Sequence, residues 1–356
     1  MNILHIINNL EIGGAQKLLV DLLPTIGKTQ KVDLLVFQDK DNEFTTKIKA
    51  EGIHITSLHT KHIYNPFLSI RLRSIIRSYD IIHVHLFPSS YWSAIASLGC
   101  KLKLVYTEHS TSNKRRNLWF LRPIEKFIYG RYSKTICISE ETQKSLVQWI
   151  NTSDVSNFPV IYNGIDLANF RHKKTDISYS NRGRNIIMVS RFVQSKDQDT
   201  VIRSLKYLPD DINLLLVGDG ERRHTCQMLT KELGLSNRVV FLGNRTDIPQ
   251  LLRSATIGIQ SSHWEGFGLT AVEMMASGLP VIASDVPGLR QVVDGAGLLF
   301  KAGNEKDLAE CINKLLSNPT LYKHTAKQGQ ERALYFDINL TAKRYLSLYN
   351  EVIKEK

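Results

Sequence analysis

Short apolar runs rich in β-branched residues alternate with longer amphipathic stretches along nearly the whole chain. The runs have the length of buried strands and the stretches have the length of helices, so the alternation predicts repeated β-α units around parallel sheets. It occurs in two series, separated by a polar segment at 171–184 with almost no large apolar residues. A chain of 356 residues with this pattern is expected to form two doubly wound α/β domains joined by a linker.

The expected strands and helices follow from the same pattern. In the first series strands are expected near 2–7, 32–37, 53–58, 80–85, 103–107, 135–138 and 159–162, with helices most clearly at 14–27 and 67–78. In the second series strands are expected near 185–190, 212–217, 238–242, 256–260 and 280–283, with helices near 198–207, 221–233, 247–253, 268–277 and 305–317. The corresponding domain boundaries are 1–168 for the N-terminal domain, 169–184 for the linker, 185–336 for the C-terminal domain, and 337–356 for a final helix expected to pack back on the N-terminal domain.

Composition excludes several classes of protein. An apolar fraction of 42% with 22% charged residues is incompatible with a disordered or fibrous chain. No apolar stretch approaches the roughly 18 residues of a membrane-spanning helix, and the first ten residues lack the basic leader of a secretion signal, so a cytoplasmic protein is expected. The four cysteines are scattered, which indicates neither a disulfide framework nor a zinc site.

The net charge of +12 is unevenly distributed. Residues 101–134 hold nine Lys and Arg against two Glu, a net +7, and are interleaved with aromatic residues such as Trp119 and Phe120. The expected helix at 67–78 adds basic and apolar side chains: Arg71, Arg73 and Arg77 with Leu72, Ile75 and Ile76. Such a surface suits peripheral contact with an anionic membrane, and a solvated basic face is the alternative.

A glycine pair, Gly13 and Gly14, follows the first expected strand and opens a helix. Without side chains these glycines let the backbone approach a phosphate, whose charge the helix N-terminus stabilises. A plain turn is the alternative. The spacing is not the Gly-x-Gly-x-x-Gly fingerprint of dinucleotide enzymes, and 217–221 does not complete one either, so the sequence disfavours a hydride-transfer enzyme.

Two cations follow the first strand of the second series. Arg191 lies where this strand ends and Lys196 lies five residues further on. Together they are able to neutralise a diphosphate without a metal, Arg through its planar fork and Lys as a point charge. Two ordinary surface cations are the alternative.

Two carboxylates flank the start of the helix expected near 268–277. Glu265 lies in the preceding loop and Glu273 lies eight residues later, in the second helical turn. Both are able to accept hydrogen bonds from sugar hydroxyls, although surface carboxylates also occur at this spacing by chance. The backbone N–H groups that open the helix are available to hydroxyls or phosphate oxygens, at Phe267, Gly268, Leu269 and Thr270.

The run Ser262-His-Trp-Glu-Gly-Phe-Gly-Leu, continued by Glu273-Met-Met-Ala-x-Gly-x-Pro-Val, resembles the donor-site signature of the retaining family-four glycosyltransferases. The resemblance covers nearly the whole chain and includes Gly13-Gly14, Glu108-His109, Asn163-Gly-Ile-Asp166, Arg191 with Lys196, and Val217-Gly-Asp-Gly220. It departs from the family pattern at Ser261, Ser190 and Gln291, none of which removes a donor-binding charge. The resemblance implies the GT-B architecture, in which two Rossmann-like domains face each other across a deep cleft.

The resemblance also implies roles for individual residues. His109, Glu265, Arg191 and Lys196 would take part in the reaction: His109 near the reacting carbon, Glu265 on the transferred sugar, and the two cations on the nucleotide diphosphate. Glu273 would hold the ribose hydroxyls, the amides from Phe267 to Thr270 would bind sugar and phosphate, and Gly13 and Gly14 would close over the diphosphate. For His109 the alternative is a residue that only shapes the acceptor pocket.

The implied reaction moves a hexose or N-acetylhexosamine from a nucleotide sugar, with UDP as the expected nucleotide, to a sugar acceptor. The acceptor is expected to be lipid-linked, in surface-polysaccharide assembly at the inner face of the plasma membrane. Asp39-Lys-Asp41 has metal-binding spacing but is interpreted as a turn, so neither a cofactor nor a divalent metal is expected, and nucleic acid is not an expected partner. The alternatives are a nucleotide-sugar epimerase of the same architecture and a non-catalytic nucleotide-sugar-binding protein.

Overall fold

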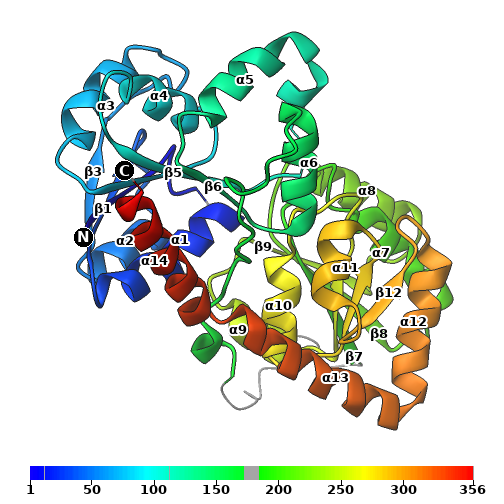
Figure 1. The fold of residues 1–356 in the computed structure, drawn as a ribbon. Coiled ribbons are helices and arrows are strands. Elements are labelled where there is room, and N and C mark those ends of the chain that lie inside the picture. Colours follow the sequence, from blue (N-terminus) through cyan, green and yellow to red (C-terminus); the bar gives the residue numbers. More distant parts are fainter. Residues whose placement is uncertain (12, 112, 172–183, 356) are drawn as a thin grey trace. The chain divides into compact units, whose positions relative to one another are not determined.

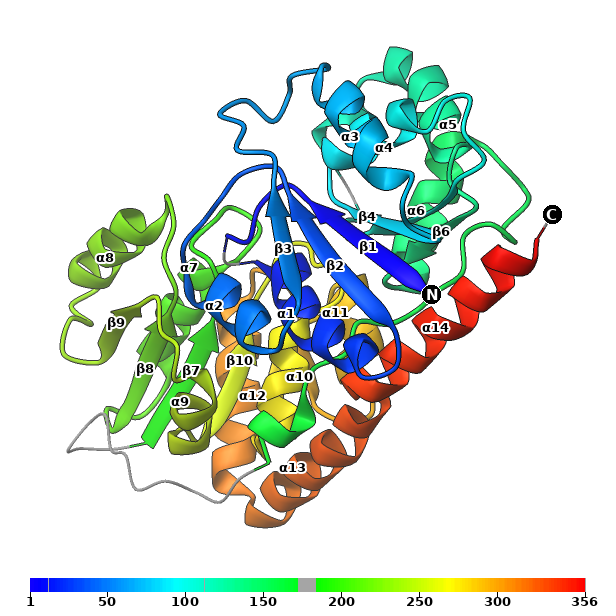
Figure 2. The same cartoon turned by 90° about the vertical axis from the view of Figure 1, so that its left-hand side faces the viewer.

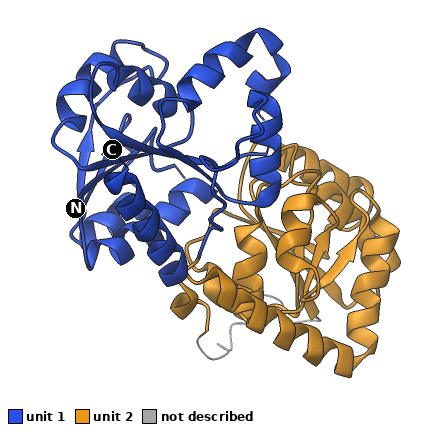
Figure 3. Ribbon diagram, viewed as in Figure 1, with its two compact units in different colours: residues 1–164, 338–356 blue, residues 165–337 orange. Residues whose placement is uncertain are grey.

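The computed structural model describes residues 1–11, 13–111, 113–171 and 184–355. They divide into two compact units, unit 1 formed by residues 1–164 with 338–356 and unit 2 formed by residues 165–337 (Figure 3). Most of the linker expected at 169–184 lies outside the described residues. Within the described part of the chain, no helix is both long and apolar enough to cross a membrane.

The described part of unit 1 holds a six-stranded parallel sheet of order β3-β2-β1-β4-β5-β6 (Figure 1). Its strands are β1 (Asn2–Ile7), β2 (Lys31–Val36), β3 (His54–Ser57), β4 (Ile81–His85), β5 (Lys103–Glu108) and β6 (Lys134–Cys137). Ile3 of β1 lies opposite Val32 of β2 on one side and Ile81 of β4 on the other. The strand order reverses between β1 and β4, and ligands of doubly wound sheets bind beyond the carboxyl ends of strands at such a point.

Helices cover both faces of this sheet. Successive side chains of each strand point to opposite faces, and both faces are apolar, so each face needs a layer of helices to bury it. Ile3 and Ile7 of β1 join one apolar core, and Leu4 and Ile6 join the other. The first core is closed by α1 (Gly14–Gly27), α2 (Glu43–Ala50) and α14 (Ile338–Lys354), of which α14 packs beside α1 (Figure 2). The second is closed by α3 (Leu68–Ile76), α4 (Ser89–Ala96), α5 (Arg122–Tyr129) and α6 (Glu140–Ile150); the short η1 (Lys114–Asn117) and η2 (Trp119–Leu121) precede α5.

The described part of unit 2 holds a second six-stranded parallel sheet, of order β12-β11-β10-β7-β8-β9. Its strands are β7 (Arg184–Val189), β8 (Ile212–Val217), β9 (Val239–Gly243), β10 (Ile257–Gln260), β11 (Val281–Ser284) and β12 (Leu298–Phe300). If the strands of each unit are numbered from one to six along the sequence, both sheets have the order 3-2-1-4-5-6. The reversal in unit 2 therefore lies between β7 and β10, which are adjacent strands.

The helices of unit 2 also form two layers. Ile257 and Ile259 of β10 face the core shared with α7 (Gln198–Ser204), α8 (Arg223–Glu232) and α12 (Glu305–Ser317). Gly258 faces the other way, where a Cβ atom would lie 2.8 Å from Met274 Sδ, so α10 (Leu269–Ala276) packs directly on the strand. The remaining elements are α9 (Ile248–Ser254), α11 (Pro287–Val293), α13 (Pro319–Ala333), and the short η3 (Leu167–Asn169), η4 (Leu205–Tyr207) and η5 (Leu334–Phe336).

The two doubly wound α/β folds confirm the predicted fold class, and some elements differ from the sequence prediction. The strand expected at 159–162 is wrong: this segment makes only an isolated bridge between Cys137 and Val160, and Pro159 has no backbone N–H to donate. The prediction omitted β12, α11 and α13. A strand of three residues is too short to show a period, which explains the omission of β12.

Candidate active site

The loops that follow β7 and β10 bring Lys196 and Glu265 together at the strand-order reversal of unit 2. The backbone N–H of His263 donates to the carbonyl of Ser195 at 2.9 Å, which ties one loop to the other. The Lys196 ammonium forms an ion pair with the Glu265 carboxylate, and the two side chains are 18% and 17% exposed. The structure thus places in contact two residues that are 69 positions apart in the sequence.

Asp197 strengthens this junction and was not singled out by sequence reasoning. Its buried carboxylate accepts a hydrogen bond from Ser261 Oγ at 3.1 Å and another from the backbone N–H of Thr200 at 3.3 Å. The first bond holds the loop after β10, and the second caps the N-terminus of α7. Ser261, one of the departures from the family signature, therefore helps to position the neighbouring Lys196.

Arg191 lies in the same loop as Lys196 and points its charge toward solvent. The loop follows β8 closely, since the backbone N–H of Ser190 donates to the carbonyl of Val217 at 2.9 Å. A Cβ atom on Gly218 would lie 2.1 Å from the Ser190 carbonyl oxygen, and the φ of Gly218 is +124°, so only glycine fits. The Arg191 side chain is exposed and has no ion pair among the described residues, which leaves its guanidinium available to an anion.

The N-terminus of α10 opens beside Glu265. Gly268 is the N-cap with φ +96° and provides no side-chain cap, so the N–H groups of Leu269 and Thr270 have no partner within the helix. The Phe267 side chain is buried and packs edge-on against Phe336, at 5.4 Å between ring centroids. These N–H groups and the positive end of the helix dipole form a local site for phosphate or sugar oxygens.

Two further residues complete the unit 2 group. Glu273 lies in the second turn of α10 and is 3% exposed. Gly288, at the start of α11, was missed by sequence reasoning: a Cβ atom there would lie 2.1 Å from the Glu265 carbonyl oxygen. The close packing of α11 on this loop holds Glu265 in place, and the Pro287-Gly288 pair was the available sequence signal.

The remaining predicted site residues belong to unit 1. Gly13 and Gly14 follow β1 and begin α1, where Gly13 is an extended N-cap without a side-chain hydrogen bond. His109 follows β5 directly. All three lie beyond the carboxyl ends of strands, the edge at which such sheets bind ligands.

His109 is a neutral hydrogen-bonding group. Its Nε2 lies 3.1 Å from Nδ1 of His85, and burial lowers the pKa of His109 to about 3. The preceding Glu108 is buried and accepts hydrogen bonds from Arg116 at 3.1 Å and Tyr129 at 2.6 Å, which anchors the loop. His109 is therefore suited to bind a hydroxyl rather than to supply a positive charge.

Candidate metal ligands lie in unit 1. Within the described residues, one group has ligand atoms close enough to share an ion: His5, His83 and His85, with nitrogens within 4.8 Å of one another. The ring nitrogens of this buried group are engaged in hydrogen bonds with one another and with neighbouring side chains. In the Asp39-x-Asp41 segment, Asp39 is hydrogen-bonded to His59.

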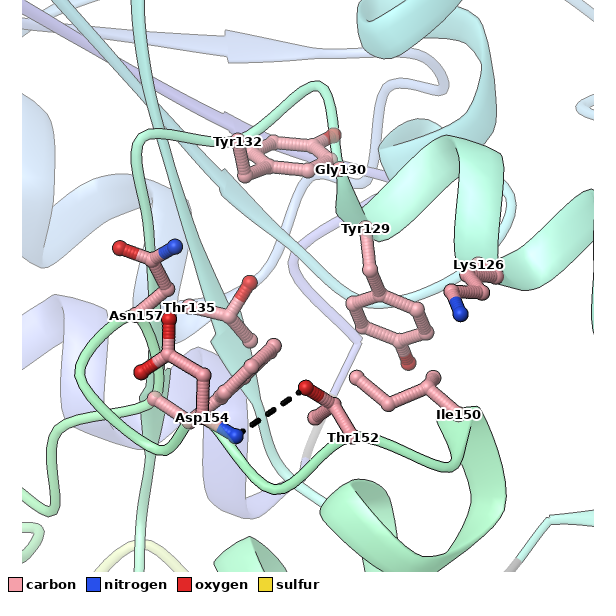
Figure 4. A pocket seen from close by; sticks show the side chains of 10 residues that line it. Lys126, Tyr129, Gly130, Tyr132, Thr135, Ile150, Thr152, Asp154 and Asn157 are labelled. Carbon is pink, nitrogen blue, oxygen red and sulfur yellow. Dashed lines mark hydrogen bonds between the residues drawn. The ribbon is translucent and has the colours of Figure 1, made fainter.

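A pocket in unit 1 lies away from the predicted site residues of that unit (Figure 4). It is lined by the end of α5 with Tyr129, the start of β6 with Thr135, the end of α6 with Ile150, and the segment that contains Asp154. Strand starts and helix ends meet at the amino edge of a parallel sheet. This pocket is therefore at the edge opposite the one that binds ligands in such folds.

Comparisons with known proteins agree with the geometry. Residues 12–169 match the family described as Glycosyltransferase Family 4, and residues 172–332 match the family described as Glycosyl transferases group 1. HepE of Anabaena, in crystal structures with UDP and glucose and with UDP-glucose, has TM-scores of 0.89 and 0.88 and is 25% and 26% identical. These matches cover 98% and 99% of this chain and 99% and 100% of the HepE chains.

Two curated relatives come from Campylobacter jejuni. The N,N'-diacetylbacillosaminyl-diphospho-undecaprenol alpha-1,3-N-acetylgalactosaminyltransferase is 36% identical over 171 residues, which are 48% of this chain and 45% of the relative. The N-acetylgalactosamine-N,N'-diacetylbacillosaminyl-diphospho-undecaprenol 4-alpha-N-acetylgalactosaminyltransferase is 25% identical over 93% of this chain and 94% of its own. The first match thus spans less than half of that relative, and the second spans nearly all of its counterpart.

Proposed function

Because this chain belongs to the family-four, group 1 glycosyltransferases of GT-B fold, we propose that it transfers a hexose or N-acetylhexosamine from a UDP-sugar to a lipid-linked sugar and retains the anomeric configuration. The observation that carries the proposal is the Lys196–Glu265 pair beside the open N-terminus of α10. The HepE complexes support UDP as the nucleotide, and the names of the Campylobacter jejuni relatives support a lipid-linked acceptor.

The unit 2 group divides naturally between the two parts of a nucleotide sugar. Arg191, Lys196 and the N–H groups that open α10 would neutralise the diphosphate as it leaves, which in this proposal removes the need for a divalent ion. When a diphosphate binds Lys196, Glu265 becomes free to accept hydrogen bonds from sugar hydroxyls. Stabilisation of the leaving group on the face where the acceptor enters favours retention.

The proposed reaction is tested with labelled UDP-sugars and an undecaprenyl-diphosphate-linked sugar in EDTA. The expected product is the extended lipid-linked glycan, with the donor's anomeric configuration kept in its NMR spectrum. Isomerised UDP-sugar without transfer would instead identify an epimerase, and binding without any turnover would identify a sensor. An inverted product, or activity that EDTA abolishes and Mn²⁺ restores, contradicts the proposed mechanism.

The Lys196→Ala substitution is expected to lower kcat/KM for transfer about 10- to 150-fold. Hydrogen bonds to charged groups contribute roughly 1.5 to 3 kcal/mol, and about 1.4 kcal/mol corresponds to a factor of ten. Lys206→Ala is the matched control, because Lys206 is an exposed lysine in η4 of the same unit. Steady-state kinetics measure kcat/KM for both variants. If kcat/KM of Lys196→Ala equals that of the parent, Lys196 does not bind the donor.

We also propose that the enzyme attaches peripherally to the inner face of the plasma membrane, and unit 1 provides the surface. The charge of 101–134 is less available than its count indicates, since Arg115 pairs with Glu125 and Lys134 pairs with Glu351. In α3, Leu72 and Ile76 are buried, so they take no part in a contact surface.

Exposed apolar residues compensate for the neutralised charge. α5 lies at the periphery of unit 1 (Figure 1). The segment that runs from the residue before η2 into α5 exposes large apolar side chains: Leu118, Trp119, Phe120, Ile124 and Phe127. Trp119 of η2 is 81% exposed, and Lys126 of the following helix α5 is an exposed cation. Aromatic rings beside cations suit insertion at the interface of an anionic bilayer, so apolar contact supplies more of the proposed binding than charge does.

Replacing Trp119 and Phe120 together by serine is expected to weaken binding to anionic vesicles at least about tenfold. Burying one large apolar side chain contributes roughly 1.5 to 3 kcal/mol, and partial insertion of two rings provides a comparable amount. Vesicle sedimentation at low and high salt measures the change. The control is Met228→Ser, which changes an exposed apolar residue of unit 2 and should bind vesicles like the parent. If both variants bind equally well, the exposed apolar residues of unit 1 do not contribute to membrane binding.

A further inference from the structure

Four histidines and two tyrosines form a hydrogen-bonded cluster inside unit 1, which the donor site does not explain. His5 of β1 and His83 of β4 are register partners, and His83 and His85 stack at 4.4 Å between ring centroids. His5, His83 and His85 are completely buried on the face covered by α14, which contributes Tyr345 and Tyr349. The cluster reaches the carboxyl edge of the sheet at His109.

The imidazoles form a chain that ends at His109. His5 Nδ1 lies 3.0 Å from His85 Nε2, and His85 Nδ1 lies 3.1 Å from His109 Nε2. At the other end, the Tyr349 hydroxyl lies 2.5 Å from His83 Nδ1 and 3.5 Å from His5 Nε2. Tyr349 is therefore linked to His109 through two intervening rings.

The direction of this chain depends on the charge state of its rings. Burial lowers the pKa of His5 to about 3 and that of His85 well below its usual range, so both rings are neutral near pH 7. A neutral imidazole has one N–H donor and one acceptor nitrogen. Each link then holds a single proton, and all the protons must point the same way along the chain.

Tyr349 decides which way they point. A phenol is a better hydrogen-bond donor than a neutral imidazole, and the nitrogen nearest to the Tyr349 hydroxyl is Nδ1 of His83, at 2.5 Å. We assign the phenol proton to this contact, so that His83 carries its own proton on Nε2 and donates it to Thr107 Oγ1 at 2.7 Å. The Tyr349 oxygen is then an acceptor, so His5 must carry its proton on Nε2 and leave Nδ1 bare. By the same reasoning, His85 carries its proton on Nε2 and accepts at Nδ1, and His109 donates to it from Nε2.

We propose that Tyr349, acting through His5 and His85, fixes His109 in the tautomer with its proton on Nε2, so that Nδ1 is a dedicated acceptor for a sugar hydroxyl. Within the described residues, Nδ1 of His109 has no hydrogen-bond partner, and the side chain is partly exposed. Tyr349, His5 and His85 are positioning residues. The substrate hydroxyl rests on the proposed glycosyltransferase function, whereas the tautomer does not.

A bare imidazole nitrogen also discriminates between ligand groups. It accepts a hydrogen bond from a hydroxyl, but it faces the oxygens of an ionised phosphate with a lone pair and no proton. The hydrogen-bonded row of imidazoles therefore makes the carboxyl edge of β5 selective for hydroxyl groups over phosphoryl groups. If its hydrogen bonds ran in the opposite direction, His109 would present an N–H donor at the same point and the preference would be reversed.

The tautomer is measured by long-range ¹H–¹⁵N NMR correlation on protein labelled with ¹⁵N-histidine, with the His109 signals assigned by their loss in His109→Gln. In the parent protein we expect Nδ1 of His109 to be unprotonated. In Tyr349→Phe we expect both tautomers, because the group that sets the direction is gone. Tyr345→Phe is the matched control: Tyr345 is equally buried on α14, but within the described residues its hydroxyl reaches the cluster only through Thr107 Oγ1, at 3.2 Å. Thr107 Oγ1 lies 2.7 Å from His83 Nε2, and neither residue is on the path from Tyr349 through His5 and His85 to His109.

The kinetic consequence follows the same pattern. Tyr349→Phe should lower kcat for transfer about tenfold and leave UDP binding within twofold of the parent, and Tyr345→Phe should leave both within twofold. His85→Asn breaks the link to His5 and should reproduce the effect on the tautomer if Tyr349→Phe folds poorly. An Nδ1-protonated His109 in the parent, an unchanged tautomer in both chain variants, or stoichiometric metal bound to the cluster would overturn the proposal. The NMR result stands whether or not the protein transfers sugar.

Discussion

Lowering the pH from 7.5 to 5.5 is expected to reduce the free energy of unfolding of unit 1 by at least about 4 kcal/mol. Burial lowers the pKa of His5 to about 3, and it lowers the pKa of His83 and His85 well below the usual range. In the unfolded chain these imidazoles have a pKa of about 6.5. Below pH 6.5 the histidines of the unfolded state therefore bind protons, whereas those of the folded state stay unprotonated. The free energy of unfolding decreases as the pH falls toward the pKa values of the folded state.

The size of this effect follows from linkage. At pH 5.5 each completely buried imidazole costs about 1.4 kcal/mol, so His5, His83 and His85 together account for about 4 kcal/mol. The partly exposed His109, whose pKa is also lowered to about 3, adds up to about 1.4 kcal/mol more. Urea unfolding followed by tryptophan fluorescence measures the free energy at both pH values, in a Trp264→Phe background that leaves tryptophans only in unit 1. In the control variant His83→Gln one proton-binding group is removed, so the loss should shrink by about a third. Equal stability at both pH values would show that the cluster is not buried as described.

Replacing Glu125 by alanine is expected to lower the free energy of unfolding of unit 1 by about 3 to 5 kcal/mol. The Glu125 carboxylate is completely buried and accepts three hydrogen bonds: from Arg115 Nε at 2.6 Å, from the Tyr91 hydroxyl at 2.8 Å and from Trp149 Nε1 at 2.6 Å. These donors come from η1, α4 and α6 and converge on α5. Removal of the carboxylate leaves the Arg115 charge and two partly buried polar groups, the Tyr91 hydroxyl and the Trp149 N–H, without their acceptor.

The control for this substitution is Glu51→Ala, because Glu51 is an exposed carboxylate of the same unit. Its removal should change the free energy of unfolding by less than about 0.5 kcal/mol. Urea unfolding at pH 7.5 compares the two variants. A loss below about 1 kcal/mol in Glu125→Ala would mean that the three donors find other partners.

The fold and the candidate donor group were accessible from the sequence because both depend on local patterns. Alternating apolar runs located most strands, and parallel strands present their carboxyl ends at one edge. Arg191, Lys196 and Glu265 were therefore predicted to share that edge before any contact was known. The ion pair between Lys196 and Glu265 was not predicted, since it depends on the hydrogen bonds that join the two loops.

The sequence misjudged features whose meaning depends on distant partners. The basic segment at 101–134 was counted as a charged surface, yet Lys134 is buried against Glu351 of α14 and Glu355, which follows that helix. His5 and Tyr349 are separated by 344 positions, and nothing in either neighbourhood indicated a hydrogen-bonded cluster. A charge count or a strand pattern carries no information on which side chains meet across the sheet.

The sequence by itself determined the two α/β units, their strand edges and the choice of candidate donor-site residues, because hydrophobic period and motif spacing are properties of neighbouring residues. The tertiary structure alone decided which charges are neutralised, which aromatic residues reach solvent, and how His109 is tied to Tyr349. Those outcomes depend on register and on helix packing, which bring together groups that are far apart in the chain. Burial of these groups then strengthens their hydrogen bonds and shifts their pKa values, because electrostatic interactions are stronger in a low-dielectric interior.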